Sequence, residues 1–266
     1  MKRLAELVPE VCDLATQAGE QVMHFYRNGA NVTFKADASP LTAADQASHD
    51  FLIRSLPELL PDIPVVSEES EGVTDRSVDH ANSFWLVDPL DGTKEFVKRT
   101  NEFTVNIALM KDGLPLLGVV HAPALNLTYY GGREIGAWRQ TGEDPPTPIT
   151  TRRAGSSQLG IVASKDHAGP LVSTMLVRLE DPQLRSMGSS LKFCLVAEGK
   201  ADLYLRDLPT MEWDTAAAQC IVEAAGGGVY SLNGEPLRYG KPHLKNPPIM
   251  TVGDTRFDWR PLISNS

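Results

Sequence analysis

Apolar residues recur at spacings of three and four near the amino terminus, which is the pattern of an amphipathic helix that ends near Asn28. The repeating positions are Leu4, Leu7, Val11, Leu14, Ala18, Val22 and Phe25. A second helix is expected from about Thr42 to Leu60, with Thr42 as its N-cap. Asp45 would then lie in the first turn of this helix.

Short apolar runs follow and predict strands at 64–67, 84–87, 103–110, 114–121, 127–130 and 136–139. The third and fourth runs flank Lys111-Asp112-Gly113, and an Asp-Gly step between two strands is typical of a hairpin turn. Residues 142–148 are rich in proline and acidic residues, so we place a soft boundary there.

Beyond this boundary, helices and strands alternate again. Strands are expected around 161–163 and 201–205, and helices around 171–179, 190–198 and 214–225. This alternation favours an α+β fold built of layers with largely antiparallel or mixed sheets. The length of 266 residues suits a single domain, 1–266, with two packed halves of approximately 1–145 and 146–266.

Composition narrows the class of protein. Apolar residues make up 42% and charged residues 22%, and no stretch approaches the roughly 18 consecutive apolar residues that span a bilayer. The amino terminus lacks an uninterrupted apolar signal segment. Cys12, Cys194 and Cys220 are odd in number and widely spaced, which disfavours a disulfide framework and any disulfide partner. We therefore expect a soluble, cytoplasmic protein.

The formal net charge is -9, which argues against a nucleic-acid partner because such binding relies on clustered lysine and arginine residues. An acidic protein can still hold a small phosphorylated molecule when divalent cations invert the local field. The carboxylates are therefore the first candidates for a functional site.

The most informative segment is an apolar run that stops in Asp88-Pro89-Leu90-Asp91-Gly92-Thr93. Pro89 at the second position of a four-residue turn is expected to bring the Cα atoms of Asp88 and Asp91 within about 7 Å, with the Leu90 carbonyl beside them. Two carboxylates about 4 Å apart repel by roughly 4 kcal/mol at an effective dielectric constant near 20, so they require a cation or a proton. Oxygen ligands without histidine or cysteine favour Mg²⁺.

Other acids are weaker signals when taken alone. Glu68 and Glu69 follow the apolar run at 64–67, and such an acidic pair is most often a solvated loop. Asp214 opens a predicted helix, where an aspartate is usually a cap. Gly92 and Thr93 offer backbone N–H groups at a predicted helix start, which suits a phosphate.

Taken together, these motifs resemble the inositol monophosphatase superfamily. They comprise Leu41-Thr-Ala-Ala-Asp45, Glu68-Glu69-Ser70, Asp88 to Thr93 and Glu212-Trp-Asp-Thr-Ala-Ala217. The resemblance covers nearly the whole chain, and the runs Trp85–Phe96 and Gly188–Gly199 are similar to CysQ-type 3'(2'),5'-bisphosphate nucleotidases. It implies a five-layered αβαβα sandwich and a lithium-sensitive, magnesium-dependent phosphatase.

The resemblance also implies roles for the matching residues. Glu68, Asp88 and the Leu90 carbonyl would hold a first Mg²⁺, and Asp88, Asp91 and Asp214 a second. Glu69 matches a position that contacts water or a third ion, which gives two or three ions per site. Thr93 and Asp45 would orient and deprotonate the attacking water.

The substrate implied is adenosine 3',5'-bisphosphate, converted to AMP and phosphate during sulfate assimilation. The residues expected around it are Glu68, Leu90, Asp91, Gly92, Thr93, Ser164, His167, Gly188, Ser190, Lys192 and Asp214. A solvated lysine and a surface histidine are the plainer interpretations of Lys192 and His167. A homodimer and a peripheral association with the inner membrane are left open.

Three alternatives compete with this hypothesis. A haloacid-dehalogenase-like phosphatase places its two acids two residues apart, whereas Asp88 and Asp91 are three apart. An inositol-phosphate or sugar-phosphate phosphatase would use the same metals without depending on Lys192 or His167. A non-catalytic nucleotide sensor would lack Thr93 or Asp45, or hold them away from the metals.

Overall fold

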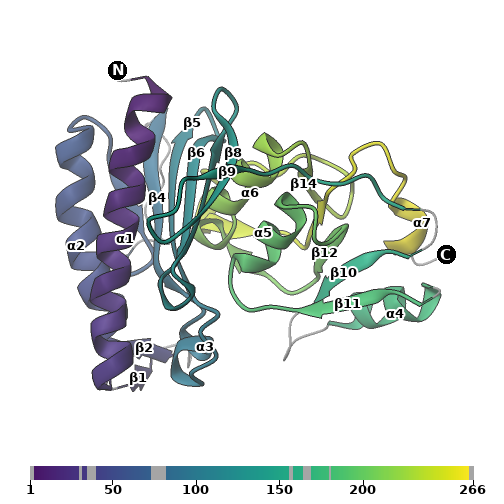
Figure 1. Cartoon of the computed structure of the whole chain (residues 1–266), viewed down its shortest axis with the longest axis horizontal. Helices are drawn as coiled ribbons and strands as arrows, with labels where there is room; N and C mark the ends of the chain where they lie inside the picture. Colours follow the sequence, from purple (N-terminus) through teal and green to yellow (C-terminus); the bar gives the residue numbers. More distant parts are fainter. Residues whose placement is uncertain are drawn as a thin grey trace.

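The computed structural model describes residues 3–29, 32–34, 40–72, 82–155, 158–163, 169–179 and 181–263. Five layers follow one another across the molecule, with helices outside and between two sheets (Figure 1). The outer layer of the amino-terminal half holds α1 (Leu4–Asn28) and α2 (Ala43–Leu59), the middle layer α5 (Leu191–Ala197) and α6 (Ala216–Ala224), and the last layer α4 (Pro170–Arg178) and α7 (Arg260–Ile263). The expected αβαβα architecture is confirmed.

The larger sheet has the strand order β3-β4-β5-β6-β7-β8-β9. Its strands are β3 (Val65–Ser67), β4 (Ser83–Asp91), β5 (Thr104–Lys111), β6 (Leu114–Ala122), β7 (Leu127–Gly132), β8 (Gly136–Thr141) and β9 (Thr147–Pro148). Strand β3 is parallel to β4, and every other pair is antiparallel. Asp112 and Gly113 have positive φ angles in the β5–β6 turn, as the predicted Asp-Gly hairpin requires.

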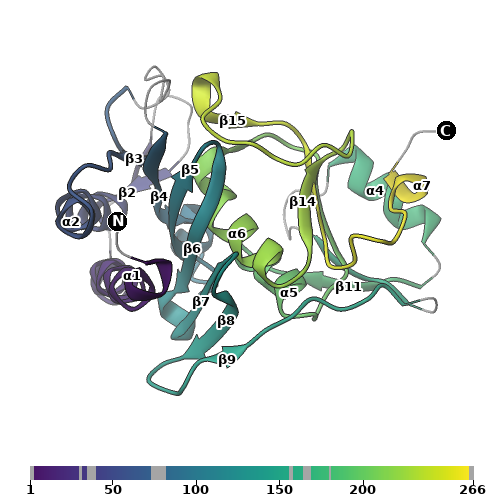
Figure 2. The same ribbon diagram turned by 90° about the horizontal axis from the view of Figure 1, so that it is seen from above.

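The smaller sheet has the order β11-β10-β12-β16-β14 and mixes parallel with antiparallel pairs. Its strands are β10 (Gly160–Ala163), β11 (Gln183–Ser186), β12 (Leu203–Arg206), β14 (Gly228–Ser231) and β16 (Ile249–Val252). Two short pairs complete the strands, β1 (Val32–Phe34) with β2 (Pro40–Thr42), and β13 (Thr210–Met211) with β15 (Lys245–Asn246). Figure 2 shows β15 above α6.

Buried apolar side chains of the described residues gather in three clusters along the boundaries between the sheets and the helices that face them. The first lies between α1, α2 and the larger sheet and includes Leu52 and Trp85. The second surrounds α5 and α6 between the two sheets. The third lies under α4 and α7. Burial of apolar area at these boundaries holds the layers together.

Short helical segments connect the layers. They are α3 (Thr93–Val97), η2 (Pro123–Leu125), η3 (Glu212–Asp214) and η4 (Pro242–Leu244). Asp214 therefore lies in a 3₁₀ turn before α6, whereas the sequence pattern placed it inside the helix. The turn is favoured because the Asp214 carboxylate accepts a hydrogen bond from the Met211 N–H, and the helix begins only after Thr215.

The expected turn at Pro89 was wrong. Strand β4 continues through Pro89 to Asp91, and its pairing with β5 shifts between Asp88 and Asp91. Asp88 faces Asn106 and Asp91 faces Thr104, so β4 carries one residue more than β5 over this interval, which is a β-bulge. A bulged residue makes no ladder hydrogen bond, and proline is tolerated there for that reason.

None of the helices within the described ranges is long and apolar enough to cross a membrane. Strand β9, at residues 147–148, lies close to the boundary predicted near residue 145. The division of the chain into two packed halves, approximately 1–145 and 146–266, stays a prediction.

Candidate active site

The parallel pairing of β3 with β4 brings two acids together. Ser67 pairs with Val87 in this register, so the next residues, Glu68 and Asp88, leave the same end of the two strands. The Glu68 N–H donates to the Val87 carbonyl over 3.2 Å, which extends the pairing to the acid itself. These two carboxylates therefore start from adjacent backbone positions.

The bulge in β4 adds Asp91 to this side of the sheet. Asn106 and Thr104 are two residues apart in β5, so their side chains share a face, and the Thr104 Oγ1 donates to Asn106 Oδ1 over 2.9 Å. Both also reach Asp91, whose Oδ2 accepts from Asn106 Nδ2 over 3.3 Å and from Thr104 Oγ1 over 3.4 Å. Asp88 and Asp91 face the same pair of polar side chains.

Ser190 joins these strands to Asp214 in the other half of the chain. Its N–H donates to Asp91 Oδ2 over 2.6 Å, and its hydroxyl donates to the Asp214 carbonyl over 2.9 Å. Only 1% of Ser190 is exposed, and Asn106 Nδ2 also donates to its Oγ. Ser190 was expected to contact the substrate, and the structure shows it bound to the Asp91 carboxylate and to the Asp214 backbone.

The acids influence one another strongly. Burial raises the pKa of Asp88 well above its usual range, and the nearby charges of Glu68, Asp91 and Asp214 raise it further. Burial also raises the pKa of Asp214, with additional contributions from Asp91 and Glu68. The four carboxylates predicted as metal ligands are thus brought close enough to repel.

These carboxylates fit a hard divalent cation in chemistry, since the donors are oxygen atoms and their mutual repulsion calls for positive charge. They do not yet form a closed coordination cage: within the described ranges, no three His, Cys, Asp or Glu side chains meet the geometry of a metal site. Oxygens of Asp91 and Asp214 are instead engaged by the N–H groups of Ser190 and Met211.

Asp45 and Thr93, which lie 48 residues apart in the chain, also meet. The Thr93 hydroxyl lies 3.3 Å from Asp45 Oδ1 and 3.3 Å from the Leu90 carbonyl oxygen. The other Asp45 oxygen accepts from the backbone N–H and the hydroxyl of Thr42, which caps α2. Burial raises the pKa of Asp45 to about 6, and the charge of Glu69 adds to this effect while the Thr42 hydrogen bonds oppose it.

A cavity of about 240 Å³ opens beside Asp91 and Asp214. It is lined by Asp91, Gly92, Lys94, Glu95, Ser189, Lys192, Phe193, Tyr204, Arg206, Thr210, Asp214 and Thr215. The cavity therefore combines three acids, two of them from the cluster, with three cationic side chains. A divalent cation that neutralised the acids would leave the cavity suited to a ligand that carries negative charge.

Lys192 is the most enclosed of these cations. Only 8% of its surface is exposed, and its ammonium group lies 5.7 Å from the centre of the Tyr204 ring. Burial lowers the pKa of Lys192, whereas the charges of Asp91 and Glu95 act in the opposite direction. A buried cation beside an open cavity is a natural partner for an anion.

Several residues in and around the cavity were missed by the sequence analysis. Arg206 lines the cavity, and its Nε is buried without a hydrogen-bond partner among the described residues. Tyr204 and Lys94 also line the cavity. Asn106 does not line it, but its Nδ2 donates a hydrogen bond to Asp91 Oδ2. Arg206 and Tyr204 belong to β12, a strand that was expected to end at residue 205, and nothing in the local pattern sets them apart.

Other predicted substrate residues differ in position. Gly188 does not line the cavity; its N–H donates to Glu102 Oε2 over 2.8 Å, and a Cβ there would lie 2.6 Å from the Glu102 carbonyl oxygen. The glycine therefore serves close packing. Ser164 and His167 fall outside the described residues.

Comparison with known proteins gives consistent matches. Residues 3–252 match the inositol monophosphatase family. The 3'(2'),5'-bisphosphate nucleotidase CysQ of Shigella flexneri is 47% identical over 236 residues, which cover 88% of this chain and 94% of that protein. The CysQ nucleotidase of Escherichia coli K12 is 46% identical over 237 residues, with the same coverage.

A solved structure agrees with this family assignment. CysQ from Bacteroides thetaiotaomicron, a bacterial member of the inositol monophosphatase family, superimposes with a TM-score of 0.78 at 38% sequence identity, covering 91% of this chain and 94% of that one. The resemblance inferred from the motifs is confirmed.

Proposed function

Because the chain belongs to the inositol monophosphatase family, we propose that it is a 3'(2'),5'-bisphosphate nucleotidase that hydrolyses a phosphate monoester with the help of Mg²⁺. The substrate is adenosine 3',5'-bisphosphate, and the products are AMP and phosphate. The observation that carries this proposal is one cavity in which clustered acids stand next to Lys192 and Arg206.

In this proposal, Glu68, Asp88 and the Leu90 carbonyl would hold one Mg²⁺, and Asp88, Asp91 and Asp214 would hold another, with Glu69 near a third position. Bound magnesium supplies positive charge that neutralises the carboxylates and the transferring phosphoryl group. The raised pKa of Asp88 and the oxygen-only donors support this ligand set.

The chain's own proton acceptor is Asp45. Its Oδ1 accepts from the Thr93 hydroxyl, so Thr93 can in turn accept a proton from a water that attacks the phosphorus and pass its own to Asp45. A pKa of about 6 leaves Asp45 ionised at neutral pH, yet basic enough to hold the proton. Gly92 and Thr93 begin α3 and present backbone N–H groups to the phosphate.

Recognition of the second phosphate falls to the cations of the cavity. Lys192 and Arg206 line it together with Ser189 and Thr210, and the clustered acids Asp91 and Asp214 line the same cavity. A monophosphate has no group to satisfy both cations. This arrangement favours the nucleotide bisphosphate over the runner-up substrate class of inositol and sugar phosphates.

A nucleotide sensor without catalysis is the less favoured function. That hypothesis requires Thr93 or Asp45 to be absent or turned away, whereas their side chains lie 3.3 Å apart. The role in sulfate assimilation, the homodimer and the peripheral association with the inner membrane stay predictions.

The test combines one substitution with a substrate panel. Asp91→Ala removes a proposed metal ligand, and kcat for adenosine 3',5'-bisphosphate is expected to fall at least about 100-fold at saturating Mg²⁺, because the cation that would stabilise transition-state charge loses one of its ligands. Phosphate release is measured for the bisphosphate, AMP and inositol 1-phosphate side by side.

The matched control is Glu143→Ala, which removes an exposed acid from the loop after β8 and should leave turnover as in the wild type. Unchanged turnover in Asp91→Ala would refute the ligand set. A preference of the wild type for inositol 1-phosphate would refute the substrate while leaving the phosphatase chemistry in place.

A further inference from the structure

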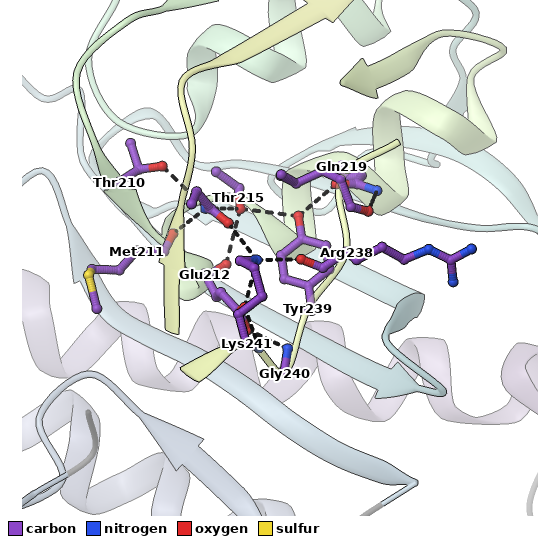
Figure 3. A network of polar contacts seen from close by, with 11 residues as sticks. Thr210, Met211, Glu212, Thr215, Gln219, Arg238, Tyr239, Gly240 and Lys241 are labelled. Carbon is purple, nitrogen blue, oxygen red and sulfur yellow. Dashed lines mark hydrogen bonds and ion pairs between the residues drawn. The ribbon is translucent and has the colours of Figure 1, made fainter. Parts of the chain in front are cut away.

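Another carboxylate, that of Glu212, lies two residues before Asp214 and takes no part in the chemistry proposed above. Glu212 is completely buried, and both of its oxygens are engaged by the loop that follows β14 (Figure 3). Gly240 N–H donates to Oε2 over 2.7 Å and Lys241 N–H to Oε1 over 3.0 Å. The Lys241 ammonium lies 2.7 Å from the same Oε1.

The same loop also contacts Thr215, the residue that follows Asp214. Asn246 Nδ2 donates to Thr215 Oγ1 over 2.9 Å and to the Met211 carbonyl over 2.8 Å, and the Tyr239 hydroxyl lies 3.1 Å from Thr215 Oγ1. Strands β13 and β15 pair alongside. Residues 239–246 therefore clasp the 211–215 segment before and after Asp214.

Lys241 connects the parts of this clasp. Besides Glu212, its ammonium group donates to Asn246 Oδ1 over 3.1 Å and to the Arg238 carbonyl. Its side chain is 29% exposed, so it reaches Glu212 from the rim of the loop. It is not among the residues that line the substrate cavity.

Stability alone does not account for this ion pair. A buried ion pair often contributes no more stability than well-packed apolar side chains of similar volume, because desolvation of the charges offsets their attraction. What it does supply is a fixed geometry, since a carboxylate with three donors cannot shift without losing one of them. Only Trp213, which is itself buried, separates Glu212 from Asp214 in the chain. Fixing Glu212 therefore also restricts where the backbone of Asp214 can lie.

The position of Asp214 is where such fixation matters. Asp214 lines the same cavity as Asp91, and a metal ligand must be held within about 0.5 Å of its working place. We propose that Lys241, through Glu212, is a positioning residue that fixes Asp214 for cation binding. This inference rests on the proposed function, in which Asp214 is a metal ligand.

The test measures cation binding directly, in the full-length protein and without substrate. Lys241→Met keeps the apolar stem and removes the charge, and Mn²⁺ is the probe, titrated by calorimetry. The Kd for Mn²⁺ is expected to rise roughly 10- to 100-fold, the range seen when partners of metal ligands are removed, with the folded far-UV circular dichroism retained. Hydrolysis should then require correspondingly more Mg²⁺.

Lys245→Met is the matched control. It removes the same charge from the same loop, yet the Lys245 side chain is exposed and Lys245 takes part in the clasp only through its backbone pairing with Met211, so the Kd of this variant should stay within about twofold of the wild type. Glu212→Gln, which keeps an acceptor oxygen, and the double variant complete a cycle. The double variant is expected to bind Mn²⁺ no more weakly than the worse single variant, because both act through one contact.

Each outcome decides the matter. A lowered melting temperature in Lys241→Met with an unchanged Kd for Mn²⁺ would assign the pair to the fold alone and overturn the proposal, as would failure of both single variants to fold. Additive effects in the double variant would also overturn it. A wild-type protein that neither binds Mn²⁺ nor releases phosphate would instead refute the proposed function.

Discussion

In the proposed function, Asp45 serves structure and chemistry with different oxygens. Oδ2 accepts from Thr42 and closes the first turn of α2, while Oδ1 accepts from Thr93. Only 2% of the residue is exposed, and this burial raises its pKa to about 6. The capping role and the role as proton acceptor can therefore be separated by a substitution that keeps the shape.

Asp45→Asn is expected to lower kcat by roughly 10²- to 10⁴-fold, because the amide keeps an acceptor oxygen but does not take up a proton. The unfolding free energy should fall by only about 1 kcal/mol, the scale of a helix cap. Steady-state kinetics and urea unfolding measure the two effects. Asp50→Asn, an exposed acid one turn further along α2, should change neither; a wild-type kcat in Asp45→Asn would exclude it as the base.

For single residues, the sequence predicted the acids of the candidate site better than the residues around those acids. The motifs named Asp45 and Thr93, and the structure brings them within 3.3 Å. The expected turn at Pro89 was wrong because pairing with β5 continues past it. Arg206 was missed because its place in the cavity depends on how β12 is laid into the second sheet, which no local pattern encodes.

Among the elements, α6 sits unusually close to the larger sheet. A Cβ on Gly118 of β6 would lie 2.1 Å from the Ala217 carbonyl oxygen and 2.8 Å from its carbonyl carbon. On β7, a Cβ on Gly131 would lie 3.1 Å from Ile221 Cα. Two glycines therefore let the helix backbone approach the strands, and this contact seats the helix that follows Asp214.

Gly118→Ala is expected to lower the unfolding free energy by about 3 kcal/mol, at the upper end of the usual overpacking penalty, because the new methyl group meets backbone that must move. Equilibrium urea unfolding measures the loss. Gly155→Ala is the control, since a Cβ there meets nothing within 4 Å and the change should stay within about 0.5 kcal/mol. Equal stability of the two variants would mean that α6 shifts freely.

Longer elements were predictable from periodicity and turn chemistry. The pattern from Leu4 to Phe25 gave a helix, observed at Leu4–Asn28, and Asp112-Gly113 gave the hairpin. The two-residue strands β13 and β15 and the 3₁₀ turn before α6 were not anticipated. The two strands exist because of pairing between segments about 35 residues apart, so their sequences carry little signal of their own.

Burial of apolar side chains between the layers holds the whole molecule together, and some polar side chains are buried with them. His121 of β6 is 4% exposed; Gly19 of α1 faces its ring, and its Nδ1 lies 2.8 Å from Thr128 Oγ1. Burial lowers its pKa from 6.5 to about 4. The imidazole is therefore neutral in the fold throughout the physiological range.

This shift makes the stability of the fold depend on pH. Between about pH 6.5 and 4 the unfolded chain binds a proton at His121 that the folded chain does not, so this contribution is complete above pH 6.5 and is lost as the pH falls towards 4. The full loss is roughly 3 kcal/mol. Urea unfolding at pH 7.5 and pH 4.5 measures it as the difference between the wild type and His121→Gln.

Comparison with the variant is needed because Asp45, with its raised pKa, acts in the opposite direction over part of this range. His24→Gln, at an exposed position of α1, should leave the pH dependence of the wild type intact. A His121→Gln protein that loses as much stability on acidification as the wild type would contradict the assignment.

The bulge in β4 has a consequence for how this chain tolerates change. In a regular strand, side chains three positions apart lie on opposite faces, and the additional residue between Asp88 and Asp91 returns them to one side, opposite Asn106 and Thr104. The Pro89-Leu90 interval should thus accept other amino acids more readily than a different length. Deleting or inserting one residue there would rotate an acid out of the site while leaving every acid in the sequence.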